Sequence, residues 1–575
     1  MKKAIGLVFK FCISNFRIIL IWGTILLGIN MLQPLEIKIV NALIKSLHEE
    51  CSFIFLVGLF LLFFFITIFK ELQSSLNEVL HIFFQNRISK YFFSLFVNNI
   101  RHRGIIDYDN SDFLLKIKRS KISIDSKIYQ IIANLLQIIA GIVSLFFLSA
   151  MIVDVDKLFL VFFIIIFALQ LVYSKKITNA NLKLYRVQDN DQRKHTYFNG
   201  LMRSRESIKE IRISNCMGWI EGKRKQVYSK IEYEHLRFIK KWNLINAIWT
   251  ILGTGMETLI FLYLVYGYSI EIFSVEEVVL IIQSQEVLIL YLISMINTFS
   301  QIRQDMEYLK DFAYCCNQKK AKVVDNIELS EKKLIKIQNI FFAYSPGEQI
   351  LKDCSIEINK GEKIMVVGKN GCGKTTLVKL ILGLYKPTKG NILFNKKKGN
   401  VVFQDYVRYK FSLRENIGVG NVADIDDEKY IKELLDELKL EYLYQNEKGL
   451  DVMLGKEFDD DSIDLSGGEW QKIAIGRAMF NKDSDLIILD EPTAALDPIA
   501  ELQEFNKICE YFSNKTVVLI SHRIGLAKSV DKVVYMDNGR ICEVGTHVEL
   551  MKNKGNYYNF YNSQAKWYCM ERGDA

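Results

Sequence analysis

Long apolar stretches in the first half of the chain restrict its fold more than any other feature of the sequence. A helix needs about 20 apolar residues to cross roughly 30 Å of hydrocarbon. Buried helices of a soluble core are the alternative, but a run such as residues 53–66 has no polar face. We therefore predict six transmembrane helices. They cover residues 18–44, 53–69, 128–153, 158–173, 244–268 and 278–299.

The links between these segments differ in length and charge, and this difference predicts the orientation of the chain. The links near residues 48–50, 154–156 and 271–277 are short with few basic residues, whereas those at about 70–127 and 175–242 are long and rich in Lys and Arg. Lys and Arg accumulate on the cytoplasmic side of membrane proteins. We expect a multi-pass protein in the lipid bilayer of the cell membrane, with both long links, both termini and the second domain in the cytoplasm. This placement accounts for much of the formal net charge of +9 and argues against nucleic acid as a partner.

At 575 residues the chain is too long for one hydrophobic core. The composition becomes charged at about residues 303–322, as expected for a helix that leaves the membrane as a linker. From about residue 326, short β-type runs alternate with helical segments, which is typical of an α/β domain. The predicted fold is an all-α transmembrane domain of six helices over residues 1–325, followed by an α/β domain over residues 326–575.

A glycine-rich loop follows a short apolar run in the α/β domain. Its form, Gly368-x-x-x-x-Gly373-Lys374-Thr375, is the phosphate-binding loop pattern. Glycines such as Gly371 let successive backbone N–H groups face one anion-binding concavity, and the helix that follows adds its positive N-terminal end. Lys374 can reach the outer phosphates, and the Thr375 hydroxyl can ligate Mg²⁺. The domain is therefore predicted to be a P-loop ATPase.

Three further apolar strands end in polar side chains that suit the same chemistry. A carboxylate at the tip of a strand can hold Mg²⁺, and its neighbour can polarise an attacking water. Parallel strands would place these groups along one sheet edge beside the phosphate loop. The strands and their polar ends are residues 401–403 with Gln404, 486–489 with Asp490 and Glu491, and 517–520 with His522. Upstream of the loop, Tyr344 is positioned to stack on a nucleobase.

The stretch Leu465-Ser-Gly-Gly-Glu-Trp-Gln471, together with the phosphate loop, resembles the ATP-binding cassette (ABC) transporters. Six spans before an ATPase resemble the exporter branch of that family, and the resemblance extends over essentially the whole chain. It implies ATP and Mg²⁺ as cofactors. It also implies that a signature formed by Ser466, Gly467 and Gly468 contacts the nucleotide of a second copy of the chain.

The resemblance assigns a role to each residue of the nucleotide site. Glu491 matches the general base or water-positioning residue, and His522 the switch histidine. With Lys374 and Gln404 they form the implied catalytic set, and Thr375, Gln404 and Asp490 the implied metal site. The implied nucleotide contacts are Tyr344 for adenine and Gly368, Asn370, Gly371, Cys372, Gly373, Lys374, Thr375 and Thr376 for the phosphates.

Two positions depart from the family pattern. Glu469 stands where glutamine is usual, and Ala494 where serine is common. Neither removes a phosphate donor, so we expect two competent sites in a homodimer, with a heterodimer as the alternative.

The implied function is ATP-driven export by alternating access of the dimer. Residues 454–474 resemble the subgroup that exports lantibiotics and related modified peptides, so a peptide is the expected substrate. A general multidrug or lipid exporter and an ATP-gated membrane receptor or channel are the alternatives. The first span starts near residue 18, which leaves no room for the peptidase domain of some peptide exporters.

The spans and the long links contain further candidates. Glu257 and Glu286 lie deep in the last two spans and should face an interior path, either to recognise substrate or to hydrogen-bond between helices. Residues 107–115 and 206–213 each combine capping residues with a short amphipathic turn. By resemblance they are coupling helices that transmit the nucleotide state to the spans, and solvated loops are the alternative.

Overall fold

The computed structural model describes residues 2–317, 332–345, 347–394, 399–457, 459–491, 510, 512, 514–521 and 524–570. The chain divides into two compact units. The first consists of Met1–Arg103 with Asn110–Lys320, and the second of Gly104–Asp109 with Ala321–Ala575. The segment Gly104–Asp109 thus belongs to the second unit, although the sequence on both sides of it belongs to the first.

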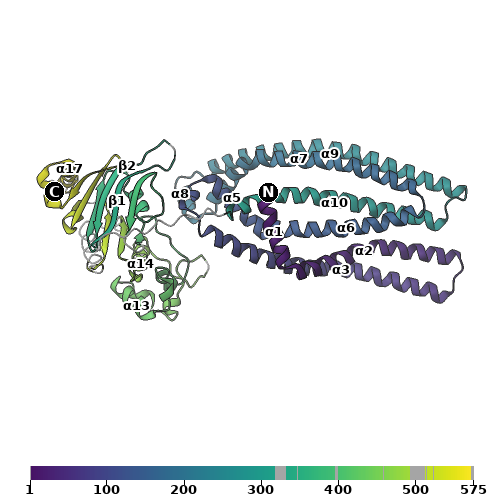
Figure 1. Ribbon diagram of the computed structural model, residues 1–575, viewed down its shortest axis with the longest axis horizontal. Helices are drawn as coiled ribbons and strands as arrows, with labels where there is room; N and C mark the ends of the chain where they lie inside the picture. The colour runs from purple at the N-terminus through teal and green to yellow at the C-terminus, as the bar shows by residue number, and fades with distance from the viewer. Residues whose placement is uncertain are drawn as a thin grey trace. The chain divides into compact units, whose positions relative to one another are not determined.

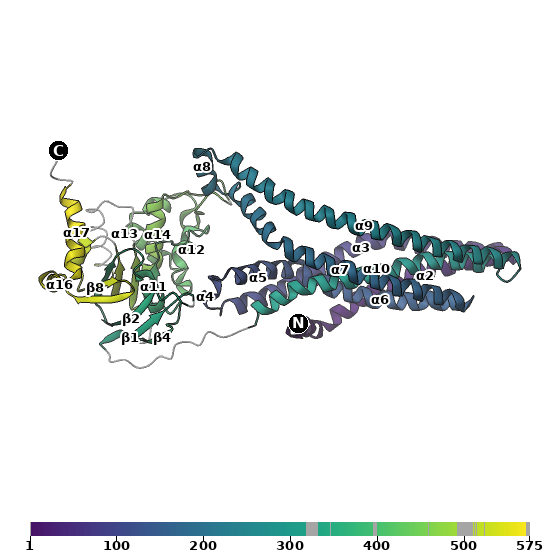
Figure 2. The same cartoon turned by 90° about the horizontal axis from the view of Figure 1, so that it is seen from above.

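The first unit is built from long helices, in which α6 and α10 run side by side, as do α7 and α9 (Figures 1 and 2). Side-chain caps fix several of their starts. At the start of α10, for example, Ser274 and Glu277 form a capping box. The helices are α1 (Lys2–Ser14), α2 (Phe16–His48), α3 (Phe53–Ile100), α5 (Ser111–Ile122), the π-helical turn η1 (Ser123–Lys127), α6 (Ile128–Val153), α7 (Lys157–Leu201), α8 (Arg205–Ile213), α9 (Met217–Ser269) and α10 (Val275–Cys315).

Among the described residues, five helices are long and apolar enough to cross a membrane: Phe16–His48, Phe53–Ile100, Ser111–Val153, Met217–Ser269 and Val275–Cys315. The sixth predicted span, residues 158–173, falls in α7, where several side chains lie outside the described residues. Helices α3 and α9, with 48 and 53 residues, are much longer than the about 20 residues that a bilayer requires. The helices therefore continue well past the length of a span.

Pro34 lies inside α2 and leaves the carbonyl of Asn30 without its helical N–H donor. Side chains of two other helices donate to this carbonyl instead. The Tyr291 hydroxyl of α10 donates at 2.7 Å, and the Ser144 hydroxyl of α6 at 3.1 Å. Since an unpaired buried carbonyl costs roughly 1–3 kcal/mol, the proline joins α2, α6 and α10 at one point.

The second unit contains two sheets. A three-stranded antiparallel sheet has the order β2-β1-β4, and a six-stranded sheet the order β5-β6-β7-β3-β8-β9, parallel except for β9. Strands β6 and β7 are apolar and buried throughout, as expected for central strands covered on both faces. The strands are β1 (Lys333–Phe342), β2 (Leu351–Asn359), β3 (Lys363–Gly368), β4 (Lys389–Phe394), β5 (Asn400–Val402), β6 (Leu486–Asp490), β7 (Thr516–Ile520), β8 (Lys532–Asp537) and β9 (Arg540–Gly545).

Helices pack against the parallel sheet and complete two buried apolar clusters. Trp470 of α14 is 1% exposed and anchors one cluster, and Leu377 and Val378 of α11 belong to the other. The helices are α4 (Ile105–Tyr108), α11 (Lys374–Ile381), α12 (Leu413–Gly418), α13 (Glu428–Glu437), α14 (Gly467–Phe480), α16 (His547–Asn553) and α17 (Asn556–Met570). An all-α unit followed by an α/β unit confirms the predicted fold class.

Candidate nucleotide-binding site

The phosphate loop connects β3 to α11, and its backbone requires glycine at two points. Gly368 has φ +153°, and a Cβ there would lie 2.2 Å from the carbonyl oxygen of Met536. Gly373 has φ +102°, and a Cβ there would lie 2.7 Å from Leu351 Cδ2. A side chain at Gly368 would displace the backbone of β8, and one at Gly373 would meet the Leu351 side chain in a left-handed backbone conformation. The glycines therefore keep the loop closed against the sheet while its N–H groups stay at the helix N-terminus.

Lys374 is the buried cation of this loop. Its side chain is 6% exposed, and its ammonium donates to the carbonyls of Gly368 at 2.9 Å and Lys369 at 3.0 Å. Burial lowers the pKa of Lys374, and the nearby carboxylates of Glu491 and Asp490 act in the opposite direction. A phosphate group placed in the loop would offer this ammonium a stronger acceptor than two carbonyls.

The other loop residues differ in exposure. Asn370 is exposed, whereas Cys372 and Thr376 are buried. Burial raises the pKa of the Cys372 thiol, so the thiol stays protonated and weakly nucleophilic at neutral pH. Cys372 is therefore a small filler that packs behind the loop.

The ends of β5 and β6 bring polar groups beside the phosphate loop. Val402 of β5 pairs with Leu489 of β6, and Asp490 pairs with Ile520 of β7, so the ends of these strands align. The side-chain amide of Gln404, two residues beyond β5, donates to Glu491 Oε2 at 2.9 Å.

Asp490 and Glu491 differ in environment. Asp490 is 3% exposed, and burial raises the pKa of its carboxyl while a hydrogen bond from Thr375 lowers it. Glu491 has φ +51°, a left-handed conformation that costs about 1–3 kcal/mol, and its N–H donates to Ile520 O at 2.9 Å. This conformation directs the two adjacent carboxylates to different partners.

The donor set fits a hard divalent cation. Thr375, Asp490 and Gln404 offer hydroxyl, carboxylate and amide oxygens, the ligand types of Mg²⁺. In the described part of the chain, no cluster of three or more His, Cys, Asp or Glu residues could hold a metal ion. A Mg²⁺ ion here would therefore need phosphate oxygens of a nucleotide to complete its shell.

Tyr344 lies on the base side of the loop. Its hydroxyl is 3.2 Å from Thr376 Oγ1, and its ring meets those of Phe342 and Tyr385 edge-to-face, with centroids 4.9 and 5.3 Å away. The side chain remains 37% exposed. The ring is thus held in place with surface left for a base.

The signature forms the start of α14. Ser466 is the N-cap and accepts from Glu469 N at 3.3 Å, while Glu469 accepts from Ser466 N at 2.7 Å. The Tyr442 hydroxyl also donates to Glu469. Gly467 and Gly468 are exposed, and a Cβ on either would meet nothing within 4 Å.

The unusual Glu469 is thus the reciprocal member of a capping box. Hydrogen bonds from Tyr442 and Ser466 lower the pKa of Glu469, which keeps it charged beside the positive end of the helix. No hydrogen bond among the described residues joins Ser466, Gly467 or Gly468 to the phosphate loop of the same chain. His522 and Ala494 lie outside the described residues.

Comparison with known proteins identifies this arrangement. Residues 351–494, which contain the phosphate loop, the signature and Asp490-Glu491, match the ABC transporter family model. Two relatives extend over nearly the whole chain. The subtilin transport ATP-binding protein SpaT of Bacillus subtilis is 28% identical over 96% of this chain and 92% of its own length. The nisin transport ATP-binding protein NisT of Lactococcus lactis is 28% identical over 88% of each chain.

Residues 351–494 form an ABC transporter domain. A bacterial Atm1-family ABC exporter with ATP bound has the same fold, with a TM-score of 0.81 and 17% identity over 96% of this chain and 99% of the other. The chain is therefore a multi-pass membrane protein with the ABC exporter fold, which hydrolyses ATP coupled to transport. It combines the membrane and ATP-binding parts in one polypeptide.

Two features of this ABC transporter were not found from its sequence. Arg477 of α14 donates to Val407 O at 2.6 Å and to Asn416 O at 2.8 Å, and it lies over the ring of Tyr409 at 4.7 Å. Burial lowers its pKa to about 10. Arg477 therefore holds the segment that follows Gln404. Its sequence signal was a cation within the apolar second half of α14, residues 473–480.

The second feature is a contact of the short α4 segment. The Tyr385 hydroxyl donates to Asp109 Oδ2 at 2.6 Å, and both residues belong to the second unit. Burial, then the Asp109 contact, raises the pKa of Tyr385. Since Tyr385 also meets Tyr344, one ring connects the segment Gly104–Asp109 to the base side of the nucleotide site.

The remaining candidates lie in the membrane unit. Glu257 of α9 is half-buried and Glu286 of α10 is exposed on the isolated chain. Of the two expected turns, residues 107–115 form the end of α4 and the start of α5, capped by Asn110, and residues 206–213 lie in α8. Their functional roles stay predictions.

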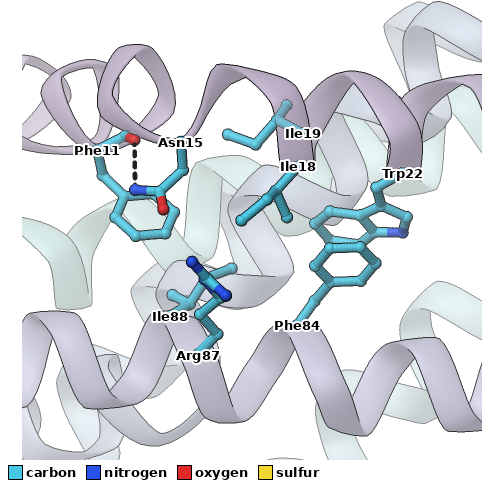
Figure 3. Close-up of a pocket in the computed structure, with 8 residues that line it drawn as sticks. All are labelled: Phe11, Asn15, Ile18, Ile19, Trp22, Phe84, Arg87 and Ile88. Carbon is cyan, nitrogen blue, oxygen red and sulfur yellow. Dashed lines mark hydrogen bonds between the residues drawn. The ribbon is translucent and has the colours of Figure 1, made fainter.

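A small hollow between α1, α2 and α3 is too small for a ligand (Figure 3). Its volume is about 10 Å³, room for at most about one water molecule. The Trp22 and Phe84 rings stack at its edge with centroids 4.5 Å apart, and Asn15 donates to Phe11 O at 3.1 Å where α1 meets α2. The hollow is a packing feature of the helix junction.

Proposed function

We propose that this ABC transporter exports a modified peptide across the cytoplasmic membrane, as a dimer driven by ATP with Mg²⁺. The observation that carries the peptide assignment is the near-complete match to two relatives that are named for transport of subtilin and nisin. The match includes the membrane unit, which must contain any substrate path. At 28% identity it supports a substrate class and not a particular peptide.

The nucleotide chemistry follows from the described side chains. Lys374 binds the outer phosphates, and Thr375, Asp490 and Gln404 would hold a Mg²⁺ ion, which would supply charge neutralisation on the phosphates. Glu491 accepts a proton from the attacking water or orients it, while Gln404 holds Glu491 by their 2.9 Å hydrogen bond. His522 is assigned to the transferred phosphate from the sequence pattern alone.

A second copy completes the site. Gly467 and Gly468 present open backbone N–H groups at the N-terminus of α14, a position suited to bind an anion. No hydrogen bond among the described residues joins this signature to the phosphate loop of the same chain. In a head-to-tail homodimer, each signature faces the nucleotide of the other chain. A heterodimer with a related subunit would use the same chemistry.

The proposed orientation of the chain in the membrane rests on the distribution of its basic residues. The long basic links and the ATPase unit lie in the cytosol, where ATP is available, and the short links face outward. ATP closes the dimer, the spans change from inward- to outward-open, and hydrolysis resets them. Asp109 and Tyr385 are positioned to pass this change between α4 and the nucleotide site.

The test is ATPase activity of the full-length transporter in lipid nanodiscs, with a substrate panel. We expect nisin and subtilin to raise ATP hydrolysis severalfold over the basal rate. Stimulation by lipophilic drugs or lipids but not by peptides would instead establish a drug or lipid exporter. Passive ion conductance of the ATP-bound protein in planar bilayers would establish a channel. Glu491→Gln protein is the control for contaminating ATPases.

A further inference from the structure

A cavity of about 370 Å³ lies in the membrane unit between α2, α3, α6 and α10. This volume is in the range of sites that bind small ligands or a short peptide segment. Its polar lining is unusual for a membrane unit because it consists mainly of carboxamides. The polar residues that line it are Asn30, Gln33, Gln73, Asn77, Gln137 and Tyr291.

One wall of the cavity is held in place by its own hydrogen bonds. Gln137 Nε2 donates to Asn30 Oδ1 at 3.2 Å, and Asn30 Nδ2 donates to Leu26 O at 2.8 Å. The Tyr291 hydroxyl is held by the Asn30 carbonyl that Pro34 leaves open. This wall is therefore pre-organised, and its groups need little rearrangement to meet a ligand.

The opposite part of the lining has unused hydrogen-bonding capacity. The side-chain amides of Gln33, Gln73 and Asn77 are half-buried, and among the described residues they have no hydrogen-bond partner. Each amide offers two donors and one acceptor. Half-buried polar groups in an apolar environment are costly unless something pairs with them.

The charge of the cavity selects the class of ligand. Among the described residues that line it, the one cation is Lys70, which is paired with Glu36 at 2.7 Å, so this lining is close to neutral. A cationic drug would prefer a carboxylate, and a lipid tail would prefer an apolar wall. Peptide groups carry one donor and one acceptor each and match carboxamides in both.

The cavity lies where α3 changes from apolar to polar. Its apolar run ends at Phe69, and Lys70 is about 26 Å along the helix from Phe53 at 1.5 Å per residue. In the proposed orientation this depth is the inner edge of the hydrocarbon, which a substrate from the cytosol reaches first.

We propose that this carboxamide cavity binds the backbone amide groups of the exported peptide before ATP closes the dimer. The inference rests on the proposed peptide-export function. Gln73 and Asn77 make the discriminating contacts, while Asn30 and Gln137 hold the wall that faces them.

The test measures equilibrium binding of fluorescently labelled nisin to the full-length transporter in nanodiscs, and nisin-stimulated ATPase. The variants are Gln73→Leu and Asn77→Leu, alone and combined. Gln283→Leu is the matched control, a half-buried amide of α10 that does not line the cavity. We expect at least about tenfold weaker binding and lost stimulation in the double variant, with normal basal ATPase and a normal control.

Two results would overturn the inference, and they distinguish an error in the cavity assignment from an error in the proposed function. If the native transporter binds nisin and the double variant binds it equally well, the cavity assignment alone is wrong. If no modified peptide of a panel that includes nisin and subtilin binds to the native transporter or stimulates its ATPase, the peptide function fails and the proposed occupant with it. Should the double leucine variant be unstable, Gln73→Ala with Asn77→Ala removes the same amides without adding charge and must weaken binding similarly.

Discussion

The side-chain amide of Gln404 donates a 2.9 Å hydrogen bond to the carboxylate of Glu491. The two residues are 87 positions apart in the chain and follow the neighbouring strands β5 and β6. This bond holds the carboxylate that we propose acts on the attacking water. The amide oxygen of Gln404 remains available as a ligand for Mg²⁺. Gln404 can thus contact the Mg²⁺ ion through its amide oxygen and the Glu491 carboxylate through its amide nitrogen.

We predict that Glu491→Gln retains ATP binding and lowers ATP hydrolysis by about 100-fold or more, because an amide cannot accept the proton of the attacking water. The geometry of the Gln404 contact would largely persist. Binding of a fluorescent ATP analogue and single-turnover hydrolysis measure the two effects. Near-normal turnover in this variant would remove Glu491 from the proposed mechanism.

Tyr385→Phe removes the hydroxyl that bonds Asp109 but keeps the ring beside Tyr344. We predict basal ATPase within about twofold of the native rate and a clear loss of peptide stimulation, because only the connection to α4 is cut. The matched control is Tyr430→Phe, whose hydroxyl donates to Met479 O within the ATPase unit. Equal loss of stimulation in both variants would contradict a specific role for the Asp109 contact.

Asp305 of α10 is 1% exposed and bonds Lys127 Nζ at 3.0 Å and Gln301 Nε2 at 3.1 Å. Asp305→Asn leaves a largely buried ammonium without its counter-charge, so we predict a loss of about 2–4 kcal/mol in stability. Thermal unfolding of the full-length protein in detergent measures this loss of stability, which should appear as a lower thermal midpoint. Asp112→Asn breaks an exposed ion pair with Lys116 and should change the midpoint little. Similar midpoints for both variants would refute the assignment.

The capping carboxylate Glu469 gives a pH-dependent prediction. Its pKa is lowered in the folded protein by Tyr442 and Ser466, so its stabilising contribution is fully present above the unfolded value of 4.5. That contribution is lost as the pH falls through the lower, folded-state value. Glu469→Gln keeps the cap but not the charge. Its thermal midpoint should lie slightly below the native one at pH 7, and the difference should close below pH 4.5. A constant difference across this range would exclude a role for the charge.

Local sequence patterns were sufficient to predict those elements that are determined by residues close together in the chain. Apolar runs of span length, the glycine spacing of the phosphate loop and the alternating α/β segments predicted the fold class, since each depends on residues close together in the chain. The signature residues and the carboxylates after β6 also belong to short motifs. The family and its ATP-hydrolysing activity followed from these motifs and were confirmed by comparison.

Tertiary structure decided the contacts between residues that no motif links. The bond from Tyr385 to Asp109 joins positions 276 residues apart. Glu469 stands where the family has glutamine, and its contact with the Tyr442 hydroxyl, which explains the carboxylate there, is visible only in the folded structure. The cavity amides, such as Gln73 and Gln137, come from separate helices, and none is unusual in its own segment. Sequence shows which groups a helix or strand carries, whereas packing determines which of them meet, because that depends on the register and rotation of elements far apart in the chain.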